Sequence, residues 1–314
     1  MRVLVWVAAF FIAVGGAANC LAKESARAVS AIDDQVDQEP ATDLDDVIVS
    51  GLPLEQRLLR FIQEASSPVP GRGLARWQGP VCIGVVNFRA AVGQQLADGL
   101  AHLGGRLGVP INDEACEPNI IIVGAVDAKA VARGWVERGP REFRPNLSEA
   151  SLSRAQLTHF ATTDAPVRWW AISRPSYYDI LAGRAVPTDS FTGRPEISVH
   201  SVSLQAGRTR DDLQRLVVVV DVSQTEGRNV EALTAYLAMV SFAQMDMQAD
   251  MREFDTVLNL FNPQFDVSGL TAWDEAYLRG LYSVRSDERI NADTQSGAAV
   301  KFLEEALPLA DDAQ

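Results

Sequence analysis

The sequence predicts an α/β (α+β) fold, a five-stranded mixed sheet with long helices packed against it. Three observations predict this class. Short, continuous apolar runs of strand length are typical of strands that are buried on both faces. Segments with apolar residues at helical spacing separate these runs, which indicates layers of helix and sheet. One further segment alternates apolar and polar residues, as a strand at a sheet edge does.

Each predicted strand follows from one of these patterns. VCIGVVNF, NIIIVGAV, VRWWAIS and RLVVVVDVS are apolar runs, whereas ISVHSVSLQ alternates and is predicted to be the edge. A loop is predicted for SYYD, shortly after the third run. The five predicted strands are Val81–Phe88, Asn119–Val126, Val167–Ser173, Ile197–Gln205 and Arg215–Ser223.

Helical spacing of apolar residues predicts the remaining elements. In the first helix Leu54, Leu58 and Phe61 fall on one face, and in the second the pair Gly104–Gly105 is expected to close the helix. The predicted helices are Leu52–Ser66, Ala90–Gly108, Ala128–Val136, Ser151–Ala161, Asn229–Met245, Leu270–Tyr282 and Ala298–Ala306.

The charge balance is strongly acidic and restricts the partners. The chain has 28 basic and 41 acidic residues, a net charge of −13. A negative chain is unsuited to sequence-independent binding of nucleic acid or of anionic membranes, because both need a positive surface. Part of the negative charge lies in Ala31–Asp46, which is polar and poor in large apolar groups and is predicted to be a disordered linker.

The N-terminus has the layout of a secretory signal peptide. Arg2 is followed by the apolar run Val3–Val14 and then by small residues. The run is shorter than the roughly 20 residues of a membrane span, and no later stretch is long and apolar enough for one. A lipid anchor at Cys20 is the alternative, although the preceding Asn19 does not suit that signal. We therefore expect an exported protein, periplasmic or extracellular.

After export, Cys82 and Cys116 remain as an even pair of cysteines. Both lie at or just before strand-like runs, and in an oxidising compartment such a pair is expected to form a disulfide. The alternative is two buried thiols. The predicted organisation is a signal peptide (1–22), an acidic linker (23–46), one globular domain (47–284) and a C-terminal helical tail (285–314).

The last third of the chain carries a specific resemblance. Thr256–Phe261, TVLNLF, follows the predicted helix Asn229–Met245, and LTAWD (Leu270–Asp274) then begins a helix that ends in Leu281–Tyr282. This order is similar to that of the metzincin zinc peptidases. In metzincins, five strands and a first helix precede a catalytic helix with a His-Glu-x-x-His motif, a turn lies under the metal, and a closing helix begins Leu-(Ser/Thr)-x-x-Asp. The chain also resembles an uncharacterised family of exported bacterial proteins that share this ending.

The catalytic groups that the resemblance implies are missing. Aligning the peptidase motif places its first His at Ala238, its Glu at Met239 and its second His at Phe242. A catalytic zinc needs imidazole, thiolate or carboxylate donors, and the glutamate takes a proton from the metal-bound water. Hydrocarbon and thioether side chains do neither. We expect a core-packing helix here, no catalytic residue and no metal or other cofactor, and we expect Asp274 to cap or brace the last helix.

Aromatic residues are the remaining candidates for binding. Trp169 and Trp170 point to opposite faces of one predicted strand, so one ring is expected in the core and the other at or near a surface. Tyr177 and Tyr178 lie in the predicted loop that follows. Tyr and Trp are favoured at binding surfaces, although ordinary packing also explains them. In peptidases of this architecture the substrate lies extended along an edge strand, so the predicted edge suggests capture of an extended peptide.

Two functional hypotheses follow. The first is a non-catalytic exported protein on a degenerate metallopeptidase-like scaffold, which binds an extended peptide or a protein of the cell envelope. The second is a hydrolase or metalloprotein with an unrecognised active site. The fold class alone does not separate them, because function belongs to the site and not to the scaffold.

Overall fold

The structure is a computed structural model. It describes residues 52–68, 73–112, 115–144, 152–179, 184–187, 209–284 and 292–307. All of them belong to one compact unit, Gly51–Gln314. The predicted signal peptide and acidic linker lie outside the described residues.

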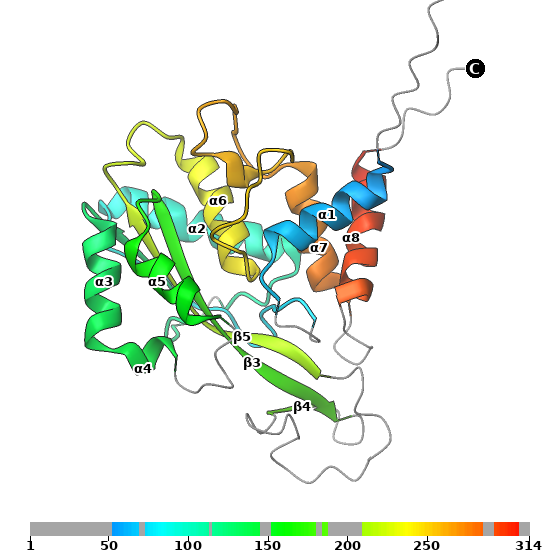
Figure 1. The fold of residues 1–314 in the computed structure, drawn as a ribbon, viewed down its shortest axis with the longest axis horizontal. Helices are drawn as coiled ribbons and strands as arrows, with labels where there is room; N and C mark the ends of the chain where they lie inside the picture. The colour runs from blue at the N-terminus through cyan, green and yellow to red at the C-terminus, as the bar shows by residue number, and fades with distance from the viewer. Residues whose placement is uncertain are drawn as a thin grey trace, which may run out of the picture. The chain divides into compact units, whose positions relative to one another are not determined.

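The fold is built on one mixed sheet with the strand order β1-β2-β5-β3-β4. Strands β1, β2 and β5 run parallel. Strand β3 lies between β5 and β4, which Figure 1 labels, and is antiparallel to both. The mixed α/β class is therefore confirmed. The strands are β1 (Ile83–Val86), β2 (Ile120–Ala125), β3 (Val167–Asp179), β4 (Arg184–Pro187) and β5 (Thr209–Asp221).

Four of the predicted strands are present, as β1, β2, β3 and β5. The predicted edge strand, Ile197–Gln205, lies outside the described residues. Strand β4 was not predicted, and the prediction of a loop at Ser176–Asp179 is wrong, because this segment is the end of β3. It pairs with β4 on one side and β5 on the other, so backbone hydrogen bonds to two neighbours stabilise a strand in a polar sequence.

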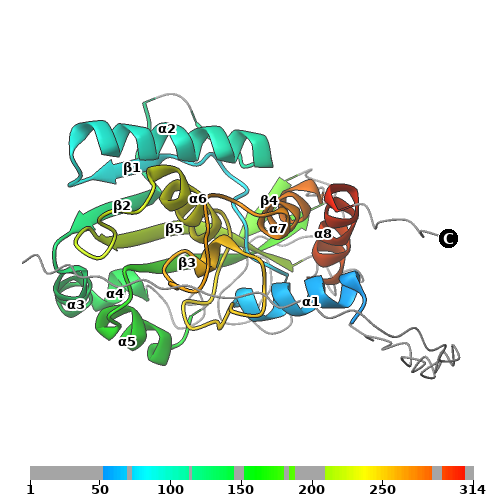
Figure 2. The ribbon, with the colours of Figure 1, turned by 90° about the horizontal axis from the view of Figure 1, so that it is seen from above.

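The first face of the sheet is covered by helices α2 (Ala90–Leu107) and α6 (Val230–Phe242) (Figure 2). Side chains alternate between the faces along each strand. On the α2 and α6 side, Ile120, Ile122 and Val218 are fully buried and belong to the main hydrophobic core. The central strands therefore supply this core with every second residue.

The opposite face is covered in part by α3 (Ala128–Arg138), α4 (Pro140–Phe143) and α5 (Arg154–Thr162). A smaller core forms there around Trp170, whose ring centroid lies 6.1 Å from that of Phe160. Elsewhere on this face Ile121, Val123 and Val217 are only half-buried. The expectation that these strands are buried on both faces is therefore wrong at this part of the sheet, because α3–α5 are too short to cover it.

The predicted helices correspond to helices of the structure, although their first or last residues differ. The remaining ones are α1 (Leu54–Ala65), a 3-10 turn η1 (Val257–Asn259), α7 (Ala272–Ser283) and α8 (Ala292–Ala306). The predicted bounds Ala90–Gly108 agree with α2, but Gly104–Gly105 lie within the helix, so the expectation that this pair closes it is wrong. The helix ends at Gly108, whose φ of 84° is the left-handed conformation that closes many helices.

Helix α8 belongs to the globular unit, so the predicted boundary before a separate tail is corrected. Val300 and Leu303 are buried against the main core. The buried Gln295 side chain accepts a hydrogen bond from Leu74 N at 2.8 Å and donates one to Leu74 O at 3.0 Å. This pair satisfies both backbone groups of a residue distant in sequence, which attaches α8 to the segment after α1.

The disulfide between Cys82 and Cys116 is confirmed. It joins the segment before β1 to the segment before β2, across a sequence separation of 34 residues. The Asn119 side chain reinforces this connection, since its Oδ1 accepts a hydrogen bond from Cys82 N at 2.8 Å. The start of the two parallel strands is thus fixed covalently and by a hydrogen bond.

Candidate functional site

Helix α6 contains the positions where the resemblance places zinc ligands. Ala238, Met239 and Phe242 are each 0% exposed. All residues from 232 to 242 are buried, so α6 is a core helix on every side. The Phe242 ring approaches Gly104 of α2. These positions therefore face packed side chains and not an open cleft.

The C-terminal end of α6 is held by aromatic side chains from three other segments. Trp77 Nε1 donates to Ser241 O at 2.8 Å, Tyr282 Oη donates to Phe242 O at 2.6 Å, and Trp169 Nε1 donates to Met245 O at 3.1 Å. Carbonyls in and after the last turn of a helix lack intrahelical partners, and when buried they need other donors. These indole and phenol groups are structural.

Asp274 braces the turn to the closing helix, as expected. Its carboxylate is fully buried and accepts hydrogen bonds from Thr256 Oγ1 at 2.5 Å, Val257 N at 2.8 Å and Thr271 N at 2.9 Å. Thr271 and Asp274 also form the capping box of α7. Burial raises the pKa of Asp274 to about 6, against the lowering effect of these donors. The side chain serves the fold.

Metal-binding side chains do not gather in the described part of the chain. No group of three or more His, Cys, Asp or Glu residues there is placed to hold an ion. His102 lies on α2 and His159 on α5, which cover opposite faces of the sheet. His200 lies outside the described residues.

Trp169 and Trp170 point to opposite faces of β3, as expected, and both rings are largely buried, although Trp170 also lines an apolar groove. Their exposed fractions are 6% and 2%. Trp169 belongs to the main core, and Trp170 Nε1 donates to Phe143 O at 2.8 Å in the smaller core. The backbones of Tyr177 and Tyr178 pair with β4 and are therefore in a strand and not in a loop.

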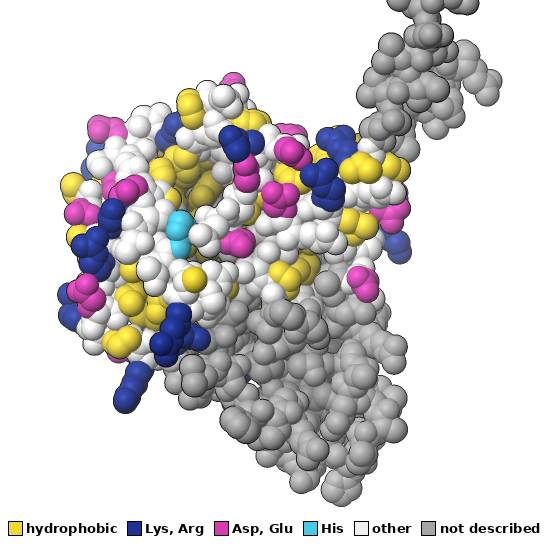
Figure 3. All heavy atoms as spheres, in the orientation of Figure 1, with side chains coloured by type: hydrophobic (Ala, Val, Ile, Leu, Met, Phe, Trp, Pro, Cys, Tyr) yellow, Lys and Arg dark blue, Asp and Glu magenta, His cyan; other side chains and the backbone are white. Residues whose placement is uncertain are grey.

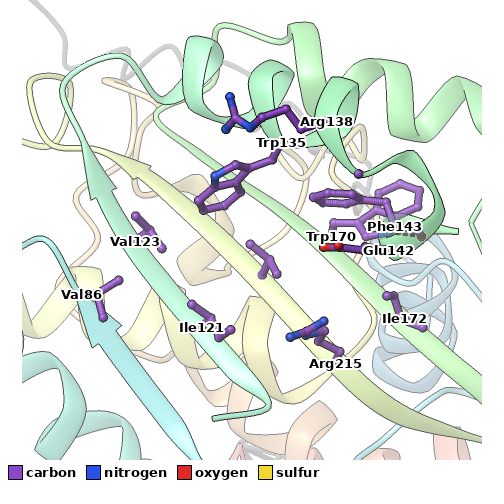
Figure 4. A pocket seen from close by; sticks show the side chains of 12 residues that line it. Val86, Ile121, Val123, Trp135, Arg138, Glu142, Phe143, Trp170, Ile172 and Arg215 are labelled. Carbon is purple, nitrogen blue, oxygen red and sulfur yellow. Dashed lines mark hydrogen bonds between the residues drawn. The ribbon is translucent and has the colours of Figure 1, made fainter. Parts of the chain in front are cut away.

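An apolar groove lies where α3–α5 leave the sheet uncovered (Figure 4). It has a volume of about 560 Å³, within the range of ligand sites. The floor crosses β1, β2, β5 and β3, and the wall is formed by α3 and α4. Its apolar lining consists of Val86, Ile121, Val123, Trp135, Phe143, Trp170, Ile172 and Val217. We call this feature the sheet groove.

Charged side chains of both signs lie among the apolar lining of the sheet groove. Arg138 and Glu142 come from the helical wall, and Arg215 comes from β5. Figure 4 shows Trp135 projecting from α3 over the strands, with Val123 and Ile121 opposite it and Arg215 toward one end. The groove thus combines an apolar floor with separate positive and negative groups, which suits a ligand that has apolar side chains and polar backbone or end groups.

The sequence predictions missed Trp135, Arg138 and Arg215 as site residues. The sequence feature that could have indicated this groove was the pattern of apolar residues on both faces of β2. In β2 the outer residues Ile121 and Val123 are as apolar as the inner Ile120 and Ile122, although the helices that follow are short. A two-sided apolar strand with too little helix to cover it indicates an exposed apolar face.

Comparison with known proteins gave no match to a family model, to a curated protein or to a solved structure. None of the helices in the described part of the chain combines the length and the hydropathy of a membrane span. The function is therefore inferred from the geometry of the described residues.

Proposed function

We propose that this protein is an exported binding module that holds an extended peptide segment in the sheet groove. The observation that supports it most is the half-buried apolar face formed by Ile121, Val123 and Val217. Exposed contiguous apolar surface is costly in water and commonly marks a binding site. Mixed charges at Arg138, Glu142 and Arg215 favour a peptide over a purely apolar ligand, because backbone and end groups need polar partners.

The dimensions of the floor suit a short extended segment. Four neighbouring strands at about 4.8 Å spacing extend over about 14 Å. An extended chain advances about 3.3 Å per residue, so about four or five residues cross the floor. Alternate side chains of such a segment point to the same side, and two of them reach the floor between Trp135 and Ile172.

Binding without catalysis fits the chemistry of the lining. The described residues around the sheet groove include no serine, cysteine or histidine, and Glu142 is the single carboxylate among them. A hydrolase needs an activated nucleophile or an activated water beside a base and a group that stabilises the developing charge. The lining instead offers contact area and charge complementarity.

Replacing Val123 by Glu should weaken peptide binding by at least about tenfold, because it places a charge on the apolar floor. The measurement is fluorescence anisotropy with labelled peptides of about six residues that carry Leu or Phe at alternate positions. The matched control is Val126→Glu. Val126 follows β2 on the same segment, is 76% exposed and lies outside the sheet groove.

Equal affinities of the two variants, or no binding of such peptides to the unaltered protein, would contradict the proposal. Both variants should unfold at nearly the same temperature as the unaltered protein, since neither position is fully buried. A peptide with the same composition but with its apolar residues grouped at one end should bind more weakly than the alternating one.

We also propose export and a metzincin-like scaffold. The signal-peptide pattern supports export, and the Cys82–Cys116 disulfide is consistent with an oxidising compartment. The order of α6, turn and α7 supports the scaffold, as does the bond of Asp274 to Thr256. Two features depart from the expected pattern. Helices α3–α5 are inserted between β2 and β3, and α6 is buried on every side from Ala232 to Phe242.

Purified protein should contain no stoichiometric zinc, because the aligned positions Ala238, Met239 and Phe242 have no donor atom for the ion. Elemental analysis measures the content, and chelation with EDTA should leave the unfolding temperature unchanged. One zinc per chain that is lost together with stability on chelation would favour a metalloprotein and contradict the non-catalytic scaffold.

A further inference from the structure

A second cleft, of about 550 Å³, lies between α3–α4 and α5, on the other side of α3 and α4 from the sheet groove. Four arginines line it. Arg133 comes from α3, Arg141 from α4, Arg144 follows α4, and Arg154 begins α5. We call it the arginine cleft. Figure 3 shows basic side chains gathered over these helices.

Among the described residues, no ion pair balances the positive charge of the arginine cleft. Within the described part of the chain, no carboxylate forms an ion pair with any of the four arginines, and Glu137 is the single acidic residue of the lining. Some other basic side chains on this acidic protein do have carboxylate partners. These pairs are Arg60–Glu253, Arg106–Glu275, Lys129–Asp164 and Arg252–Asp250. Like charges held together without counter-charges repel one another, so the cleft favours an added anion.

Arg144 gives a second, independent indication. Its Nε is buried and has no hydrogen-bond partner, although burying an unpaired polar group costs stability. Arg144 is the C-cap residue of α4 and lines the arginine cleft. The Nε itself is closed to solvent, so a bound carboxylate would meet the outer nitrogens of the half-buried Arg144 guanidinium group.

The arrangement of the lining selects the class of anion. The guanidinium groups come from four positions around a wide cleft, so they match several separated anionic groups better than one small ion. The buried side chains of Leu157 and Ala161 provide an apolar floor. The described lining has no aromatic ring on which a nucleic-acid base would stack. Guanidinium groups bind carboxylates through paired hydrogen bonds.

We propose that the arginine cleft binds an acidic peptide segment of a partner protein, with at least two carboxylates on the arginines and an apolar side chain on Leu157. This site is separate from the sheet groove and does not depend on the function proposed for it. It supplies a charge-based recognition element on a protein whose net charge is −13.

The test uses the full chain and a fluorescein-labelled peptide of about eight residues, all Glu except for one central Leu, so that it lacks the alternating apolar pattern proposed for the sheet groove; binding is measured by anisotropy. The variant Arg141→Gln/Arg154→Gln should bind at least about tenfold more weakly for each arginine removed, since tenfold corresponds to about 1.4 kcal/mol. Binding should also weaken as sodium chloride is raised from about 50 to 300 mM, because salt screens exposed charges. Both arginines are exposed, so the variant should fold normally.

The matched control is Arg89→Gln, an exposed arginine at the start of α2 on the other face of the sheet, which should bind like the unaltered protein. Val123→Glu should also bind the acidic peptide normally, which separates this site from the sheet groove. Three results would each overturn the proposal. They are unchanged affinity of the double variant, equal binding of a peptide with Gln in place of Glu, and equally effective competition by inorganic phosphate or a short RNA.

Discussion

Replacing Asp274 by Ala should lower the free energy of unfolding by about 3 to 5 kcal/mol, because it leaves several buried donors without an acceptor. Thr256 Oγ1, Val257 N and Thr271 N all donate to this carboxylate. For a domain of this size each kcal/mol shifts the unfolding temperature by about 2 to 4 °C, so the midpoint should fall by about 10 °C. Thermal and denaturant unfolding followed by circular dichroism measure the change.

The same residue should make stability depend on pH. Burial raises the pKa of Asp274 in the folded state from the ordinary 3.8 to about 6. The folded state therefore binds this proton more tightly than the unfolded state does. The contribution of this bound proton to the free energy of unfolding is fully present below about pH 4 and is lost as the pH rises through about 6. A pKa difference of one unit corresponds to about 1.4 kcal/mol, so protonation of Asp274 contributes roughly 3 kcal/mol to the free energy of unfolding at low pH.

The variant Asp274→Asn isolates this effect, because it lacks the titrating group but keeps the shape. The stability difference between the unaltered protein and this variant should be largest near pH 4 and should narrow toward pH 7. Asp250→Asn is the control. Hydrogen bonds from Arg252 lower the pKa of Asp250 to about 2, so its contribution is lost only as the pH falls below about 4. A difference for Asp274→Asn that is constant from pH 4 to 7 would show that burial does not raise this pKa.

Replacing Gly280 by Ala should destabilise the protein by about 2 to 3 kcal/mol, since there is no room for a methyl group between α7 and α8. A Cβ at Gly280 would lie 2.4 Å from both Cα and N of Ala299. Backbone atoms do not rotate away as a side chain does, so α8 must shift as a whole. The shift disturbs the hydrogen bonds of Gln295 to Leu74. Urea unfolding measures the loss.

Gly105→Ala provides the matched control in a different helix. Gly105 lies in the last turn of α2, and a Cβ there would meet no atom within 4 Å. Removing a helical glycine without a clash should stabilise the protein by about 0.5 to 1 kcal/mol. The two substitutions should therefore have opposite signs. A Gly280→Ala variant as stable as Gly105→Ala would mean that α8 is not packed against α7 as described.

Local sequence patterns were sufficient for most elements of the fold. The apolar runs at Ile120 and Leu216 gave the correct strands, because β-branched and apolar residues are favoured in the centre of a sheet. The even pair Cys82 and Cys116, in a chain expected to be exported, predicted the disulfide. The role of Asp274 as a cap or brace of the last helix was also predicted correctly, because the capping box of α7 joins residues only three apart, Thr271 and Asp274.

Features that depend on distant partners were not readable in this way. Ser176–Asp179 is a strand because β4 and β5 lie on either side of it. Trp170 is buried because α4 and α5 fold over it. The sheet groove depends on how far α3 and α4 extend over the strands, and the arginine cleft depends on how α5 packs beside them. None of these relations is encoded in a local period of apolar residues.

The sequence by itself determined the α/β class, most helices and strands, the disulfide and the absence of zinc-binding groups from Ala238, Met239 and Phe242. These follow from the side-chain chemistry and spacing within short segments. The tertiary structure alone decided that α6 is buried on every side, that one face of the sheet is left half open and that four arginines from α3, the end of α4 and α5 share one cleft. Burial and charge environment depend on which surfaces meet, and residues far apart in the chain determine those contacts.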